Sequence, residues 1–319
     1  MTFITPIVKL NMDGKNNIFV KREDLIPFSF GGNKVRIVKE YVKDAELKGK
    51  NCIIGYGSVN SNLCRVLANE CYAKGIPCHI IYAYEDQKEI CEEYFNTRIV
   101  KLCGAQIYYI NKNHVAKDVK NIIQVCENKG YKPYYIFGDE FGNGNEVVPV
   151  NAYFKVYKQI MDFQKKSNIK FDYIFLATGT GMTQAGLETG RLYFNGIEQI
   201  IGISISRNAE KEKAIIEKYI SLYFLKVLNT TPENSCVNVL DQYLRGGYGK
   251  GNYDLIEYIK SIYRKYGIPM DATYVGKAFY GMNQYIKDNN LCNKNILFLH
   301  TGGTPIFFDD LIRNTNDKG

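Results

Sequence analysis

Short runs of apolar and β-branched residues alternate along the chain with longer amphipathic stretches. The short runs predict strands at 51–56, 78–82, 107–110, 134–137, 173–177, 200–205 and 295–300. The amphipathic stretches predict helices at 35–47, 61–74, 115–129, 151–164, 183–194, 210–228, 253–266 and 276–289. Strands that alternate with helices favour parallel sheets covered by helices on both faces. We therefore expect an α/β protein.

The order of these elements predicts two closely packed domains. The chain contains no internal repeat and no low-complexity linker. Residues 46–150 form a self-contained run of strands and helices, and Gly-rich loops lie on either side of it. We predict a large domain of 1–45 and 151–319 with a smaller domain, 46–150, inserted in it.

The composition is that of an ordinary soluble globular protein, with 319 residues, 45% hydrophobic and 23% charged. No apolar run approaches the ~20 residues that span a bilayer. The first residues also lack a basic segment followed by an apolar run. We expect a cytoplasmic protein without a membrane partner.

The net charge of +8 raises the question of nucleic-acid binding. Its lysines are interleaved with acidic residues, as in 39–50, which favours solvated helix faces instead. We expect no nucleic-acid partner, although the general field of a basic protein attracts small anionic ligands.

Nine cysteines are scattered along the chain without CxxC pairs. This spacing indicates neither a zinc site nor a disulfide framework. We expect reduced thiols and no metal.

One lysine occupies an unusual place. Lys34 follows Gly31, Gly32 and Asn33 and opens the helical pattern of 35–47. A lysine that follows paired glycines at the start of a helix can offer its amine as a reactive group. Lys34 is therefore the first candidate for a reactive residue.

A Gly- and Thr-rich loop follows the predicted strand 173–177. Gly179 and Gly181 let the backbone curl, Thr178, Thr180 and Thr183 add hydroxyls, and the next helix presents its positive end. These features suit a phosphate, and the absence of a GK[ST] ending and of GxGxxG disfavours ATP and dinucleotides. A plain strand-to-helix turn is the alternative.

Two further loops follow predicted strands. In 53–65, Ser61 and Asn62 lie at a predicted helix start, where backbone amides and small polar side chains can bind a carboxylate. The alternative is that either residue only caps the helix. In 297–305, His300 and Thr301 precede two glycines, and a core histidine is the alternative to a functional one. A reactive lysine, a phosphate cradle and a carboxylate grip together fit pyridoxal 5'-phosphate bound to an amino acid.

The ordered motifs that carry a family resemblance are GGNKVR (31–36), GSVNSNLCR (57–65), ATGTGMTQAGL (177–187), GGYGKG (246–251), DATYVGKAFYGM (271–282) and HTGG (300–303). Because these motifs occur in the order seen in the family, the chain resembles the 1-aminocyclopropane-1-carboxylate deaminase and D-cysteine desulfhydrase family. The resemblance extends from about residue 21 to about residue 308. The resemblance implies a fold type II pyridoxal-phosphate enzyme, two parallel-sheet α/β domains with the smaller inserted in the larger, and a homodimer.

The resemblance also implies residue roles. Lys34 matches the lysine that forms the Schiff base, Asn62 matches the residue that contacts the phenolic oxygen of the cofactor, and Thr301 matches a hydroxyl near the pyridine nitrogen. Ser61 matches a serine that binds the substrate carboxylate and takes part in proton transfer. The phosphate loop matches at Gly179, Thr180, Gly181, Met182 and Thr183, and the active-site tyrosines match at Tyr248 and Tyr274.

The chain departs from the family pattern where substrate is expected. Val275 stands where the deaminases carry Glu and the desulfhydrases usually carry Thr, so cyclopropane ring opening is disfavoured. Asn60 replaces a glutamine, Leu63 replaces a His or Gln, and Met182 replaces a glycine. These changes predict a less polar surface around a substrate held by Asn60, Ser61, Asn62, Leu63 and Tyr248.

The function predicted from these observations is a pyridoxal-phosphate lyase that carries out β-elimination on a small amino acid, with D-cysteine as the favoured substrate. The alternatives are a β-replacement synthase, an amino-acid racemase, the deaminase, and a non-catalytic ligand-binding protein on the same fold. The loops do not determine the chirality of the substrate.

Overall fold

The computed structural model describes residues 3–12, 14–232, 236–243 and 253–313. Contacts divide the chain into two compact units, Met1–Asn33 with Val150–Gly319, and Lys34–Pro149. The domain limits drawn from the sequence stay a prediction. The compact units differ from them mainly at 34–45, which the contacts assign to the second unit.

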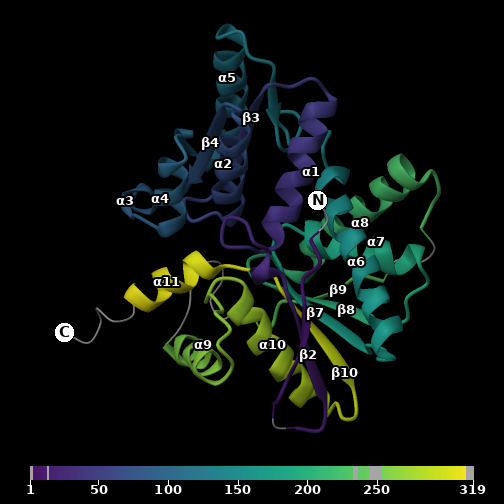
Figure 1. Cartoon of the computed structure of the whole chain (residues 1–319). Helices are drawn as coiled ribbons and strands as arrows, with labels where there is room; N and C mark the ends of the chain where they lie inside the picture. Colours follow the sequence, from purple (N-terminus) through teal and green to yellow (C-terminus); the bar gives the residue numbers. More distant parts are fainter. Residues whose placement is uncertain (1–2, 13, 233–235, 244–252, 314–319) are drawn as a thin grey trace. The chain divides into compact units, whose positions relative to one another are not determined.

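The first unit contains a six-stranded sheet (Figure 1). Its strands in spatial order are β1 (Ile7–Leu10), β2 (Asn17–Arg22), β10 (Asn295–His300), β7 (Tyr173–Thr178), β8 (Gln199–Ser204) and β9 (Asn238–Leu240). Strand β1 is antiparallel to β2, and every other pair is parallel. The parallel pairing brings the carboxyl ends of β2, β10, β7 and β8 to one edge of the sheet, where the Gly-rich loops of this unit begin.

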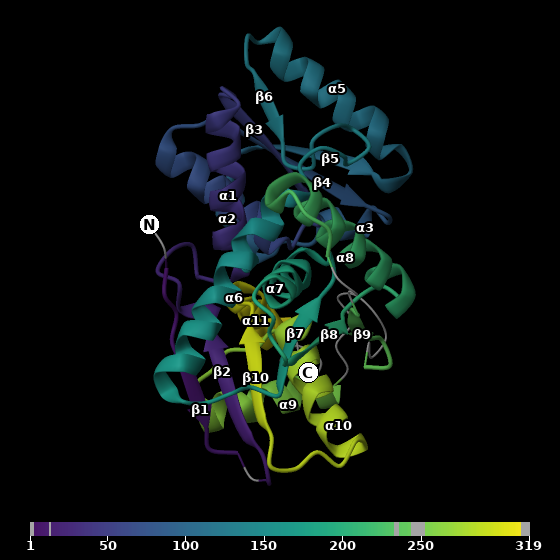
Figure 2. The same cartoon turned by 90° about the vertical axis from the view of Figure 1, so that its right-hand side faces the viewer.

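Helices cover both faces of this sheet. They are α6 (Val147–Ser167), which begins at the end of the second unit, α7 (Met182–Tyr193), α8 (Ala209–Tyr223) with a π-helical turn (Phe224–Leu228), α9 (Tyr253–Tyr266), α10 (Val275–Asp288) and α11 (Thr304–Arg313). Helices α9 and α10 pack on one face in an apolar core that includes Phe175 and Ile203. Helix α7 covers the other face, where the Gln184 side chain lies against Gly202. Figure 2 shows β1, β2 and β10 side by side.

The second unit is built on a parallel sheet of four strands. In spatial order these are β5 (Gln106–Asn111), β4 (Cys78–Tyr84), β3 (Cys52–Gly57) and β6 (Pro133–Tyr135). Its helices are α1 (Asn33–Leu47), α2 (Asn62–Lys74), α3 (Lys88–Cys91), α4 (Phe95–Leu102) and α5 (Val115–Asn128). Helix α2 packs on the sheet through Leu67, which contacts Gly55, and α5 packs on the opposite face.

The α/β fold and all fifteen predicted elements are confirmed, with ends displaced by a few residues. The pattern missed β1, β2, β9, α3, α4 and α11. Within the described residues, no helix is both long enough and apolar enough to cross a membrane.

Candidate active site

A tight turn between β2 and α1 precedes Lys34. The Gly32 N–H donates to the Glu23 carbonyl at 2.8 Å, and α1 begins at Asn33, so Lys34 lies in the first turn of the helix. Gly32 also packs directly on a second loop. A β-carbon on Gly302 would lie 2.5 Å from the Gly32 α-carbon, and φ is +98° at Gly32 and +100° at Gly302. Only glycine accommodates both the contact and these angles.

Asn33 connects this turn to two other loops of the first unit. Its backbone N–H donates to the Thr301 carbonyl at 3.0 Å. Its side-chain Nδ2 donates to Thr183 Oγ1 at 2.9 Å. The residue directly before Lys34 is therefore bonded both to the loop after β7 and to the loop after β10.

Two lysines have strongly altered titration. Burial lowers the pKa of Lys34 to about 8, so the neutral fraction of its amine near physiological pH is far larger than that of an ordinary lysine, although the protonated form still predominates. Burial also lowers the pKa of Lys277 to about 8, although the carboxylate of Asp271 acts in the opposite direction. Lys277 lies in the interior of α10 and is fully buried, and no local feature of the sequence singles it out.

The predicted phosphate loop joins β7 to α7. Gly181 is the N-cap of α7 with φ 74°, and among the described residues no side chain caps this helix. Thr180 is exposed, whereas Met182 and Thr183 are buried. Backbone N–H groups at an uncapped helix start, together with the positive end of the helix dipole, suit a phosphate.

The buried hydroxyls of this loop already have protein partners. Thr178 Oγ1 donates to Glu212 Oε1 at 3.2 Å, and Thr183 accepts the Asn33 bond described above. Glu212 is fully buried and pairs with Arg207 at 2.9 Å, and Arg207 also donates to the Gly179 carbonyl. The Glu212–Arg207 pair thus stabilises the loop between β7 and α7. The backbone amides of this loop are the groups left to bind a phosphate.

The loop after β10 begins with a histidine that has a structural role. His300 Nε2 lies 2.7 Å from the Pro269 carbonyl, and Nδ1 accepts the Gly302 N–H at 3.2 Å. These partners require a neutral ring with its proton on Nε2. Burial lowers the pKa of His300, although nearby Asp24 acts in the opposite direction. The alternative of a core histidine is confirmed.

A buried carboxylate that the sequence did not reveal holds the start of α10. Asp271 Oδ1 accepts the N–H groups of Thr273 at 2.9 Å and Tyr274 at 2.7 Å, and Oδ2 accepts that of Val275 at 3.3 Å. A β-carbon on Gly303 would lie 2.2 Å from Asp271 Oδ2. Burial raises the pKa of Asp271 to about 6, although the backbone donors lower it. Asp271 therefore links the half-buried Tyr274 to the loop after β10.

In the second unit, Ser61 and Asn62 stand at the start of α2. Ser61 is the N-cap, and its Oγ accepts the Cys64 N–H at 3.3 Å, as the capping alternative expected. Asn62 Oδ1 accepts from Asn96 Nδ2 at 3.1 Å and from Arg65 Nη2 at 3.2 Å. Because these bonds fix the oxygen, Nδ2 is the Asn62 group oriented to donate to a ligand.

Helix α4, which the sequence pattern missed, supports this segment. Asn96 Nδ2 also donates to the Asn60 carbonyl at 2.9 Å, and Thr97 Oγ1 donates to the Val59 carbonyl. Asn60 Oδ1 is buried and has no hydrogen-bond partner among the described residues. A buried polar atom of this kind is one that a ligand can satisfy.

The residues that depart from the family pattern are largely buried. Val275 is 0% exposed and belongs to the apolar core around α9 and α10. Leu63 and Met182 are also buried. Tyr248, a predicted active-site tyrosine, lies outside the described residues.

Comparison with known proteins places this chain in a family. Residues 2–302 match the family described as "Pyridoxal-phosphate dependent enzyme". The chain belongs to the pyridoxal-phosphate-dependent enzymes, and pyridoxal phosphate is its cofactor.

Relatives agree with the resemblance seen in the sequence. A D-cysteine desulfhydrase from Yersinia pestis is 27% identical, with 95% of this chain and 92% of the relative covered. A Pyrococcus abyssi protein provisionally named as a 1-aminocyclopropane-1-carboxylate deaminase is 29% identical, with 92% and 86% covered. The solved structure of a homologue of that deaminase matches with a TM-score of 0.82 at 26% identity, with 98% of this chain and 94% of that chain covered.

The described residues fit this cofactor. Lys34 offers an amine of lowered pKa, the start of α7 offers amides for a phosphate, and Asn62 offers a donor for a phenolic oxygen. Asn60 Oδ1 adds an unsatisfied acceptor next to Ser61 in the chain.

Proposed function

We propose that the protein is a pyridoxal-phosphate-dependent lyase that eliminates the β-substituent of a small amino acid. The favoured reaction converts D-cysteine and water to pyruvate, sulfide and ammonia. The observation that carries the proposal is the attachment of Asn33 to both Thr183 and the Thr301 carbonyl. This attachment holds the residue directly before Lys34 on the loop after β7 and on the loop after β10.

Bound pyridoxal phosphate supplies an electron sink for negative charge at the α-carbon of the amino acid. Lys34 Nζ would hold the cofactor and would act as the base that takes the α-proton of a bound amino acid. A pKa near 8 suits this work, because a general base is most effective when its pKa lies close to the working pH.

Three other residues position the reactants in this proposal. Asn62 Nδ2 donates to the phenolic oxygen, and Ser61 binds the substrate carboxylate and assists proton transfer. Thr301 would offer a hydroxyl, and not a carboxylate, to the pyridine nitrogen. A hydroxyl partner would leave that nitrogen largely unprotonated, which would favour β-elimination or β-replacement over transamination.

Tyr274 is proposed to serve as a proton donor or nucleophile, and Tyr248 is proposed as a second active-site tyrosine. The Tyr274 backbone is held by Asp271, so we assign Asp271 as a positioning residue. Substitution of Asp271 by Asn leaves one oxygen for the Thr273 and Tyr274 N–H groups but replaces the acceptor of the Val275 N–H by an amide donor, and it is expected to lower kcat more than it raises KM.

Relatives bear on the choice of reaction. The Yersinia protein is named as a D-cysteine desulfhydrase, and it matches nearly the whole chain. Val275 has no carboxylate, and its place in an apolar core disfavours the deaminase reaction. β-Replacement and racemisation use the same early proton transfers and are the competing functions.

Borohydride reduction of the cofactor-loaded protein, followed by peptide mass spectrometry, tests the assignment of Lys34. The label is expected on Lys34 and not on Lys277, although burial gives both lysines a similar pKa. Lys34→Ala should lose the label and the activity, whereas Lys277→Met is the matched control that keeps the label. Label on Lys277 in the wild type would refute the assignment.

A substrate panel tests the reaction. D- and L-cysteine, D- and L-serine, β-chloroalanine and 1-aminocyclopropane-1-carboxylate are each scored for pyruvate, with and without an added thiol. We expect pyruvate from D-cysteine and none from the cyclopropane. A new thioether in the thiol arm would establish β-replacement, and loss of optical rotation without pyruvate would establish racemisation.

A further inference from the structure

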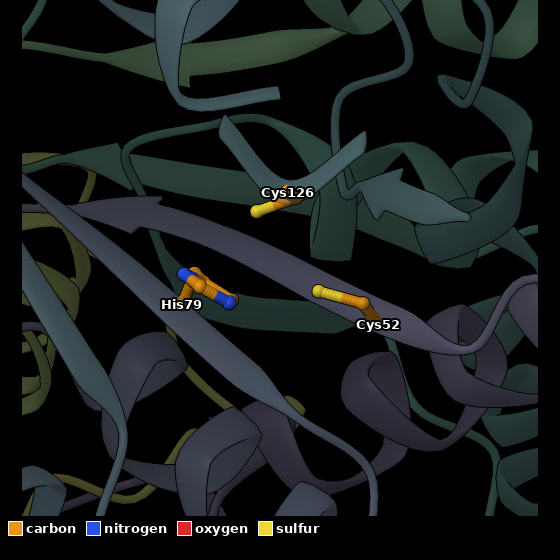
Figure 3. A group of neighbouring side chains, drawn as sticks. All are labelled: Cys52, His79 and Cys126. Atoms are coloured by element: carbon orange, nitrogen blue, oxygen red, sulfur yellow. The ribbon is translucent and has the colours of Figure 1, made fainter. Parts of the chain in front are cut away.

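Three side chains of the types that bind metals lie together inside the second unit, and none of them belongs to the motifs assigned to the cofactor. Cys52 lies on β3, His79 on β4 and Cys126 on α5. Figure 3 shows the three side chains converging, and the two sulfurs and one ring nitrogen all lie within 4.8 Å of one another. The absence of CxxC spacing hid this group, because its members are brought together only by the fold.

The sheet register explains the meeting. His79 pairs with Ile54 in the parallel ladder, and Cys52 precedes Ile54 by two residues, so Cys52 and His79 share one face of the sheet. Helix α5 covers this face and contributes Cys126 to the same apolar core. The three ligands therefore join two strands to the helix that packs on them.

The three side chains are enclosed. Cys52 and Cys126 are each 0% exposed and His79 is 5% exposed. A divalent cation that replaces both thiol protons would neutralise the two thiolates that the apolar core otherwise disfavours.

The histidine is prepared to act as a ligand. Its Nδ1 lies 3.1 Å from the Tyr108 hydroxyl, and the two rings stack at 5.8 Å. When Nδ1–H donates to the Tyr108 oxygen, Nε2 keeps the lone pair that a metal requires.

We propose that Cys52, His79 and Cys126 bind a thiophilic closed-shell cation, Zn²⁺ or Cu⁺, which fastens α5 to β3 and β4. Bonds of about 2.3 Å to sulfur and about 2.0 Å to nitrogen require only a small inward movement of the ligand atoms. Binding exchanges two S–H protons for two metal–sulfur bonds, without any change of oxidation state. Two thiolates make the Zn²⁺ site neutral, whereas three ligands match the low coordination number of Cu⁺.

A disulfide between Cys52 and Cys126 is the competing use of this pair. It would need an oxidant and would leave His79 without a role. The metal accounts for all three residues and for the Tyr108 contact, so the geometry favours it.

The test uses the full-length, cofactor-loaded protein, freed of metal with a chelator and kept reduced. Zn²⁺ in one arm and Cu⁺ in the other are titrated against a competing chelator in weakly buffered solution. We expect one ion per chain, release of two protons per ion and a rise in the unfolding temperature. The arm with the tighter binding identifies the ion, and a failure to bind either ion refutes the site.

Variants locate the site. Cys126→Ala should weaken binding by about 100-fold or more and abolish the release of two protons. Cys71→Ala is the matched control, since Cys71 is equally buried but lies on α2, and it should bind metal like the wild type. Tyr108→Phe keeps the ring and should weaken binding about 10-fold. This variant tests the site even if Cys126→Ala does not fold. Equal binding by all three variants would refute the proposal.

Discussion

The amine of Lys34 owes its titration to burial, and the same is true of Lys277. What separates the two lysines is their position, one in the first turn of a helix after a Gly-Gly-Asn turn and the other in a helix interior. The sequence predicted Lys34 because the glycines are visible in it. It could not predict Lys277 or Asp271, because nothing local marks a residue as buried.

The pH dependence of cofactor loading follows from the pKa of Lys34. Only the neutral amine has the lone pair needed for covalent attachment, so the rate of loading of the apoprotein should rise with pH and level off above about 8. An ordinary lysine, with a pKa of about 10.4, would give a rate that climbs by a further factor of more than 10. Stopped-flow absorbance between pH 6 and ~10 measures this profile, and a rate still rising at the upper end would contradict the prediction.

At the scale of elements, the strands β3, β7 and β10 were predicted, whereas β1 and β2 were missed. The three predicted strands have a continuous apolar pattern, whereas β2 carries a buried lysine that breaks the pattern. Lys21 Nζ donates to Thr5 Oγ1 at 2.8 Å and lies 3.6 Å from Glu23 Oε1. These long-range partners make the burial of Lys21 tolerable, and no local sequence signal reveals them.

The contact between the loops before α1 and after β10 predicts an intolerant position. Gly302→Ala would place a β-carbon 2.5 Å from the Gly32 α-carbon, and backbone cannot move aside as a flexible side chain can. We expect a loss of more than about 3 kcal/mol in the free energy of unfolding, together with loss of cofactor binding. Urea denaturation measures the first and absorbance the second.

Gly130→Ala is the control for this prediction. Gly130 also has a positive φ, of +83°, but a β-carbon there meets nothing within 4 Å. It should cost only about 1 kcal/mol and leave cofactor binding intact. Equal losses for the two alanine variants would mean that backbone conformation, and not loop contact, is what matters.

Helix α10 offers a second prediction. Val275→Glu, which introduces the deaminase residue, would bury a carboxylate in the apolar core and should lower stability by about 3 kcal/mol or more without creating ring-opening activity. Val275→Thr, which introduces the residue usual in desulfhydrases, should cost about 1–2 kcal/mol and keep β-elimination. Thermal unfolding measures the stability of both variants, and pyruvate assays measure their activity. A stable Glu variant would show that this position faces solvent or ligand.

At the scale of the whole molecule, the net charge of +8 should act on association with the cofactor. Pyridoxal phosphate is anionic, so its association rate should fall severalfold between ~20 and ~200 mM salt as the field is screened. Pyridoxal, which lacks the phosphate, is the matched control and should show a weaker dependence. Equal salt dependence of the two aldehydes would exclude steering by net charge.

The packing of Gly32 on Gly302 also has an evolutionary consequence. The two positions are 270 residues apart in the chain, yet neither can acquire a side chain while the other backbone stays in place. A side chain at either position is tolerated only after the opposite loop has changed its conformation, so the two glycines cannot be substituted one at a time. Diversification of function on this scaffold should therefore proceed through positions such as 60, 63 and 275, while the paired glycines persist together or are lost together.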